Sequence, residues 1–218
     1  MKLTFRYKNN DRNELEDLII GAYKDVSAQF QSELDALCVR VHNNKKDFNK
    51  QIGRETESWH VASATKGEVD IMHFDAFEKE TSHKKEDFLP ILKHEITHLF
   101  IEKITRDKAV PKWLSEGLSS YVSKQYKNIK HPVYVEENFC EKLGTPAGWD
   151  KHSNYYAYNT AALFVGFLAE KYSLNKLIEL LSNINKNYFY PDFIKKFETV
   201  FGKTLNETEK IFVNEINK

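Results

Sequence analysis

The segment H-E-I-T-H at residues 94–98 constrains this chain more than any other stretch of its 218 residues. On a helix, residues four apart lie one turn apart on the same face, so His94 and His98 can point at one metal ion. Glu95 is rotated about 100° from His94, where it can reach a water beside the metal instead of the metal itself. The segment therefore predicts a helix that presents a metal site.

The residues around this segment predict that its helix is buried. Residues 88–104 read as one helix, and apolar residues occur on nearly all sides of it. Two histidines and a glutamate in such surroundings would be strongly destabilising without partners. A metal ion is one such partner, and the alternative interpretation is two hydrogen-bonded core histidines beside a surface glutamate.

A second motif, W-L-S-E-G at residues 113–117, supplies Glu116 eighteen residues after His98. Because proline is favoured in the first turn of a helix, Pro111 predicts a helix over residues 111–126. Glu116 falls opposite the apolar stripe of that helix, among glycine and serine residues. It would complete a set of two histidines and one glutamate with an open fourth position, as catalytic zinc requires. The alternative is a solvated surface charge.

Together the two motifs resemble those of the gluzincin metallopeptidases, the group that includes thermolysin and the zinc aminopeptidases. The size and the later helices are most similar to the small bacterial members called minigluzincins and peptidase-MA-like domains. The resemblance covers about residues 67–201. It implies one zinc ion per chain, held by His94, His98 and Glu116, with Glu95 as the general base of a zinc metallopeptidase.

The resemblance extends to Tyr158. In zinc aminopeptidases a similar tyrosine stabilises the oxyanion, and it is followed by a small residue three positions on and a leucine ten positions on. Ala161 and Leu168 occupy those positions here. We therefore assign the oxyanion role to Tyr158, with Tyr155 and Tyr156 close enough in sequence to compete for it.

Two departures from the family pattern bear on the mode of cleavage. The aminopeptidase segment G-x-M-E-N, which captures a free amino terminus, has no recognisable counterpart, and Ser120 stands where thermolysin-like enzymes have an aspartate. We therefore expect an endopeptidase that acts on peptides or flexible protein segments, with an aminopeptidase as the alternative. A regulatory protein that uses the same fold to bind or cleave one partner also stays open. A deformylase-type zinc amidase would be expected to use a cysteine ligand upstream of the histidines, and Cys38 is too remote from them in sequence to suggest one.

The segment over residues 69–74 reads as a strand that follows the turn signal Lys66-Gly67. An open edge strand can pair with an extended peptide without demanding a particular sequence. We therefore predict an edge strand that binds the substrate, through Val69, Asp70, Ile71 and Met72. His60 and His73, on the strand-like segments before the first motif, are interpreted as structural.

The order of the elements, strands first and helices later, predicts an α+β fold of the zincin-like type. We expect a single catalytic domain with a mixed α/β lobe over residues 1–86 and a helical lobe over residues 87–218. Further predicted elements are strands at 3–7, 36–42 and 59–65, and helices at 12–34, 159–172, 174–183, 189–200 and 205–216.

The composition limits the partners of this chain. Its 32 acidic residues balance 32 basic ones, which is not the charge pattern of a nucleic-acid-binding surface. No segment reaches the ~18 apolar residues of a membrane span, and the amino terminus lacks the apolar stretch of a signal peptide. We therefore expect a cytoplasmic monomer whose partner is a peptide or protein substrate, with neither nucleic acid nor membrane involved.

Overall fold

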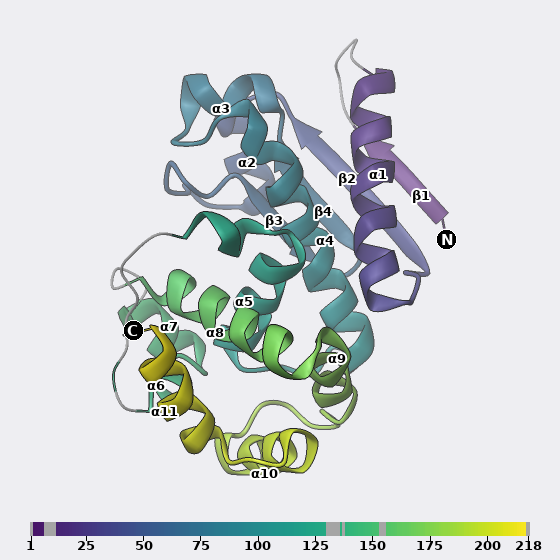
Figure 1. Cartoon of the computed structure of the whole chain (residues 1–218). Coiled ribbons are helices and arrows are strands. Elements are labelled where there is room, and N and C mark those ends of the chain that lie inside the picture. The colour runs from purple at the N-terminus through teal and green to yellow at the C-terminus, as the bar shows by residue number, and fades with distance from the viewer. Residues whose placement is uncertain (1, 7–11, 130–135, 137, 153–155, 217–218) are drawn as a thin grey trace. The chain divides into compact units, whose positions relative to one another are not determined.

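The structure, a computed structural model, describes residues 2–6, 12–129, 136, 138–152 and 156–216 (Figure 1). The described strands all precede helix α4 (Phe88–Thr105), and from α4 onward every described regular element is a helix. The predicted α+β class is thereby confirmed. None of the described helices combines the length and the apolar character that crossing a membrane requires.

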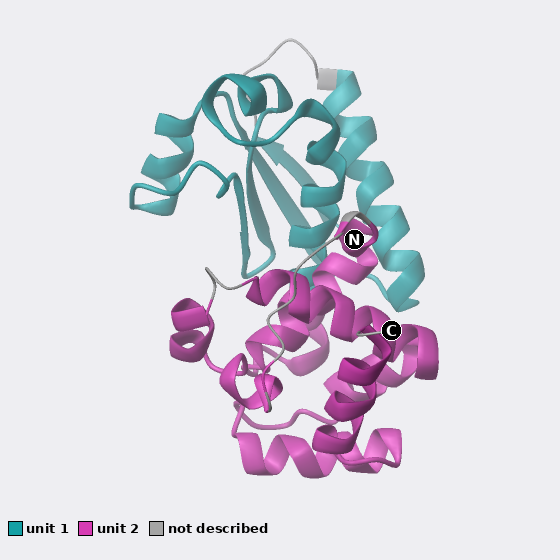
Figure 2. Ribbon diagram, turned by 60° about the vertical axis from the view of Figure 1, so that its left-hand side comes forward, with its two compact units in different colours: residues 1–100 teal, residues 101–218 magenta. Residues whose placement is uncertain are grey.

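The chain divides into two compact units, Met1–Phe100 and Ile101–Lys218 (Figure 2). Helix α4 is continuous through the point of division, and its bounds agree with the predicted helix 88–104 to within one residue. The prediction that both parts form one catalytic domain, with lobes divided after residue 86, stays a prediction.

The first unit contains a sheet and the helices around it. Its elements up to α4 are β1 (Lys2–Arg6), α1 (Arg12–Phe30), β2 (Ala36–His42), α2 (Lys45–Ile52), β3 (Ala62–Thr65), β4 (Glu68–Met72), α3 (Phe74–Glu80) and the 3-10 turn η1 (Lys85–Asp87). Helix α1 ends four residues before the predicted residue 34, because Gln31 takes a left-handed conformation with φ of 48°.

Helix α2 was not predicted, although the sequence carries signals at both of its ends. The side chain of Asn44 accepts a hydrogen bond from the backbone N–H of Asp47 at the N-terminus, and Gly53 ends the helix with φ of 81°. The helix is short and mostly polar, and Phe48 is its one fully buried apolar side chain. A single apolar anchor gives too little periodicity to predict such a helix.

The sheet order β1-β2-β4-β3 corrects the prediction of an edge strand at Val69–Met72. Strand β4 pairs in parallel with β2 on one side, where Val69 is opposite Val39, and antiparallel with β3 on the other. Val69, Asp70, Ile71 and Met72 are buried, so this strand offers a substrate neither a free edge nor exposed side chains. The sequence located the strand but could not identify its neighbours, because strand order depends on contacts remote in sequence.

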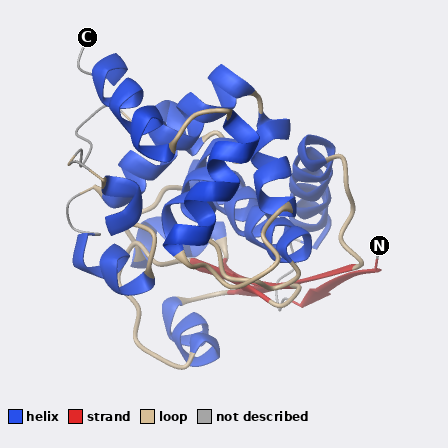
Figure 3. Cartoon of the chain, turned by 90° about the horizontal axis from the view of Figure 1, so that it is seen from below, coloured by secondary structure: helices blue, strands red, loops and turns tan. Residues whose placement is uncertain are grey.

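The two faces of the sheet differ in character. Alternation along β2 places Val39 and Val41 on an apolar face, which α1 and α4 cover (Figures 1 and 3). Between these two helices the rings of Phe30 and Phe100 stack with centroids 5.0 Å apart. The opposite face carries Arg40 and His42, and α2 packs there through Phe48, whose ring centroid lies 5.9 Å from that of His42.

The second unit is helical throughout its described regular elements. After the end of α4 these are α5 (Lys112–Val122), the 3-10 turn η2 (Gln125–Asn128), α6 (Phe139–Lys142), α7 (Pro146–His152), α8 (Ala157–Tyr172), α9 (Leu174–Ser182), α10 (Tyr190–Phe201) and α11 (Leu205–Ile216). Helix α5 stops at Val122 instead of the predicted residue 126, because Lys124 is left-handed with φ of 67°. Helix α11 has the predicted bounds.

Helices α5 and α8 approach each other closely at Gly117. A Cβ atom at this residue would lie 2.3 Å from the carbonyl oxygen of Ala161 and 2.5 Å from a methyl of Val165, so only glycine fits. One turn earlier on α5, the fully buried Trp113 packs on Phe164 of α8 with ring centroids 5.3 Å apart. The backbone of α5 is therefore held on both sides of Glu116.

Candidate metal centre

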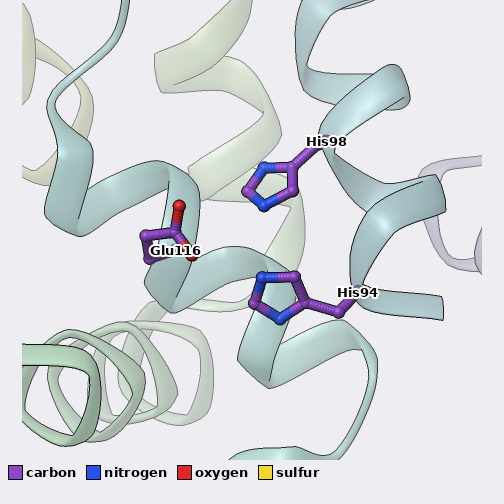
Figure 4. A group of neighbouring side chains, drawn as sticks. All are labelled: His94, His98 and Glu116. Carbon is purple, nitrogen blue, oxygen red and sulfur yellow. The ribbon is translucent and has the colours of Figure 1, made fainter. Parts of the chain in front are cut away.

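The motif H-E-I-T-H lies inside α4 as predicted. His94, Glu95 and His98 are half-buried, while the apolar side chains of the same helix turns are fully buried. The rings of His94 and His98 have their centroids 4.9 Å apart with an angle of 73° between their planes. Figure 4 shows that both rings project from α4 toward the side chain of Glu116.

Glu116 is not the solvated charge of the alternative interpretation. It is 5% exposed, although it lies on a helix that also carries half-buried residues. The first turn of α5 is fixed by two hydrogen bonds, from the N–H of Lys112 to the carbonyl of Gly144 at 2.9 Å and from Trp113 to Leu143 at 3.1 Å. The Nζ of Lys112 lies 2.6 Å from Oε1 of Glu116.

His94, His98 and Glu116 form a group that could hold a metal ion. Their ligand atoms, one from each residue, all lie within 4.8 Å of one another (Figure 4). Neighbouring ligands of a tetrahedral zinc ion are roughly 3.4 Å apart, so small side-chain rotations bring these atoms to ligating distance. Two imidazoles and one carboxylate are also the donor types that zinc prefers. The residues present therefore fit a metal ion.

Tyr158 lies in the first turn of α8, one turn before the Ala161 that packs on Gly117. Its ring meets Trp149 edge-on with centroids 4.7 Å apart, which limits how the side chain can rotate. Tyr156, one of the two competitors, is the left-handed residue that precedes α8, and the other, Tyr155, lies outside the described residues. The assignment of the oxyanion role to Tyr158 stays a prediction.

Asp70, predicted to bind substrate, belongs instead to an ion-pair network on the polar face of the sheet. Arg40 donates to both of its carboxylate oxygens at 2.8 and 2.7 Å, and Nε2 of His42 lies 2.7 Å from one of them. Arg40 also contacts Glu68 at 2.8 Å. Burial alone would raise the pKa of Asp70, but the hydrogen bonds from Arg40 and His42 outweigh it and lower that pKa. These partners are some thirty residues away in sequence, so no local signal identifies them.

The two strand-associated histidines have structural surroundings, in agreement with their interpretation. His73 is buried at the start of α3, where its Nδ1 accepts a hydrogen bond from the N–H of Asp75 at 3.2 Å. His60 stacks on the exposed Trp59, with ring centroids 5.6 Å apart, and burial lowers its pKa. Neither belongs to the group with His94 and His98.

Comparison with known proteins agrees with this geometry. Residues 89–217 match the family described as the peptidase MA superfamily, and the matched region holds His94, Glu95, His98, Glu116 and Tyr158. A search of curated proteins found no significant match. The family match spans more than half of the chain, and it supports the resemblance to gluzincin-like metallopeptidases that both motifs indicate. The chain therefore belongs to the peptidase MA superfamily.

Proposed function

We propose that this protein is a zinc-dependent endopeptidase that cleaves peptides or flexible segments of proteins. The observation that carries the proposal is the group of His94, His98 and Glu116, whose ligand atoms lie within 4.8 Å of one another. Three protein ligands leave a fourth position for water or substrate, which distinguishes catalytic zinc sites from structural ones. Glu95 is present beside the ligands, and an inactive relative that only binds a partner would not need it.

The residues of the site have separate tasks in the proposed reaction. A zinc ion held by His94, His98 and Glu116 would supply a water that is nucleophilic near neutral pH and would polarise the peptide carbonyl. The carboxylate of Glu95 accepts the proton of the attacking water and then gives it to the leaving amine. The hydroxyl of Tyr158 donates a hydrogen bond to the carbonyl oxygen as negative charge develops on it.

We assign the binding of the substrate backbone to β3 in place of β4. Strand β3 is the last in the sheet order, so among the described residues no strand pairs with its side away from β4. Backbone groups at such an edge hydrogen-bond an extended peptide whatever its side chains are. Strand β3 belongs to the same compact unit as His94 and His98, which makes it the nearest equivalent of the predicted substrate strand.

Hydrolysis of internally quenched peptides, with and without a chelator, tests the proposal. We expect about one zinc ion per purified chain, activity that is lost with the chelator, and recovery when zinc is restored. Glu95→Gln should keep its zinc and its thermal stability but lose activity by roughly 10²- to 10⁴-fold, because an amide cannot accept the proton. Glu102→Gln on the same helix is the matched control and should retain activity. Undiminished turnover in Glu95→Gln would overturn the mechanism.

The mode of cleavage is tested by blocking the amino terminus of the peptide. An endopeptidase binds its substrate on both sides of the scissile bond, so acetylation of a distant terminus should change kcat/KM by less than about twofold. Mass spectrometry of the products should show internal cuts. If only peptides with a free amino terminus are cut, one residue at a time, the aminopeptidase alternative replaces the endopeptidase.

A further inference from the structure

Lys112 forms an ion pair with Glu116 that helix stability does not explain. Its Nζ lies 2.6 Å from Oε1 of Glu116, one helical turn further along α5. Lys112 is the first residue of α5, where the partial positive charge of the helix terminus repels a cation. A lysine that precedes its glutamate by four residues is also the less favourable order on a helix. Helix stability therefore does not account for a lysine at position 112, and we look for its role in the contact with Glu116.

The pair joins a buried carboxylate to an ammonium group that reaches solvent. The side chain of Glu116 is 7% exposed and that of Lys112 is 39% exposed. An ionised carboxylate buried to this degree is strongly destabilising unless a cation compensates it. The backbone cannot move away to relieve this cost, because the N–H groups of Lys112 and Trp113 are bonded to Gly144 and Leu143.

We propose that Lys112 is an exchangeable counter-ion for Glu116, which compensates the carboxylate when no metal is bound and is displaced when a metal ion binds. The inference rests on the metal site of the proposed function. A divalent cation near Glu116 provides the compensation that the ammonium group otherwise provides. A divalent cation beside Glu116 and the ammonium group of Lys112 would also repel each other. The partly exposed lysine side chain can then turn into solvent.

If Lys112 and a metal ion compete for Glu116, removing the lysine should raise the metal affinity. Removing the ammonium group takes away the competitor for Glu116 and removes a compensating positive charge from the buried carboxylate of the metal-free protein. Both effects favour the metal-bound state, so Lys112→Met should bind zinc more tightly than the wild type. A lysine that instead held Glu116 in place for the metal would give the opposite result, because lost positioning partners typically weaken metal binding 10- to 100-fold.

Zinc affinity measured by competition with a chromophoric chelator, together with thermal melts, provides the test. We expect roughly tenfold tighter zinc binding for Lys112→Met, and a metal-free melting temperature lower by about 5 °C. With zinc bound, the variant and the wild type should melt at similar temperatures. Lys112→Arg keeps the charge and should resemble the wild type. Lys176→Met, which removes an exposed ion pair with Glu179, should change neither measurement.

A second variant shows whether the effect passes through Glu116. In the Glu116→Gln background, Lys112→Met should no longer lower the melting temperature of the metal-free protein, because there is no buried charge to compensate. Unchanged or weaker zinc binding by Lys112→Met would overturn the exchange. A wild-type protein that binds no zinc at all would overturn the proposed function and the exchange together. A wild type that binds zinc, with no tighter binding by Lys112→Met, would overturn the exchange alone.

Discussion

Asp70 on β4 and Glu116 on α5 are buried to the same extent, each with 5% of its surface exposed, yet their surroundings differ in kind. Both carboxylate oxygens of Asp70 receive hydrogen bonds from Arg40 and a third polar contact comes from His42. Glu116 has Lys112 at one oxygen and two imidazoles within ligating reach. Burial therefore does not distinguish the two carboxylates, whereas the presence of two imidazoles that could share a metal ion with the carboxylate is found only for Glu116 among the described residues.

The largest expected effect tests this distinction directly. Glu116→Gln removes the anionic ligand, so we expect zinc affinity to fall by more than ~10³-fold and peptide hydrolysis to fall with it. His94→Ala and His98→Ala should behave in the same way. Asp70→Asn, at equal burial, should retain zinc with unchanged affinity. Elemental analysis and chelator competition measure these values, and full zinc retention by Glu116→Gln would remove Glu116 from the ligand set.

The next effect is on stability and concerns Asp70. Asp70→Asn leaves Arg40 with less compensation in a buried position, so we expect a loss of about 3 kcal/mol in the free energy of unfolding near neutral pH. Urea unfolding of the zinc-loaded protein measures it. Asp17→Asn, an exposed change of the same kind on α1, should be neutral.

The pH dependence of this loss follows from the lowered pKa of Asp70. Because the folded-state pKa lies below the unfolded value of about 3.9, the stabilisation is fully present above that pH. It disappears as the pH falls through the folded-state pKa. The wild type and Asp70→Asn should therefore converge in stability in acid, and a difference that instead grows below pH 4 would contradict the ion-pair account.

The next prediction concerns Tyr158 on α8, to which we assign a role in binding the substrate oxyanion. Tyr158→Phe should lower kcat by roughly 10²-fold with little change in KM or zinc content, because the lost hydrogen bond forms in the transition state. The phenyl ring can keep the edge-on contact with Trp149. Tyr156→Phe is the control, and the reverse outcome would transfer the oxyanion role to Tyr156.

Helices that are marked by the local spacing of apolar residues were predictable from the sequence. Helix α4, which carries the candidate metal site, and the last helix α11 have bounds within one residue of prediction, because apolar residues at helical spacing mark both. The group of His94, His98 and Glu116 was also predictable, since two of its members share one helix and the third lies in its own recognisable motif.

Features that depend on contacts remote in sequence were not predictable. The interior place of β4 and the pairing of Arg40 with Asp70 both follow from strand register, which the sequence does not display. Lys112 is different, because its spacing of four residues from Glu116 was visible and signals a contact on a helix. That pair could have been found once Glu116 was assigned as a buried ligand.

The smallest expected effect comes from a third buried carboxylate, Glu209 on α11, which is 4% exposed and accepts a hydrogen bond from the backbone N–H of Cys140 at 2.7 Å. Burial raises the pKa of Glu209, and the hydrogen bond from Cys140 offsets this only in part. Its surroundings thus lack the guanidinium that lowers the pKa of Asp70, and the two carboxylates should respond to pH in opposite directions.

For Glu209 the folded-state pKa lies above the unfolded value of about 4.3, so its ionisation costs stability as the pH rises from that value through the folded-state pKa. Glu209→Gln keeps an oxygen for the N–H of Cys140 without the charge. We therefore expect a gain of about 1 kcal/mol at pH 8, seen as a melting temperature higher by roughly 2–4 °C, and no gain at pH 4. Glu198→Gln, an exposed change on α10, should show neither. A loss of stability in Glu209→Gln at pH 8 would mean that the charge itself strengthens the bond to Cys140, and that Glu209 resembles Asp70 after all.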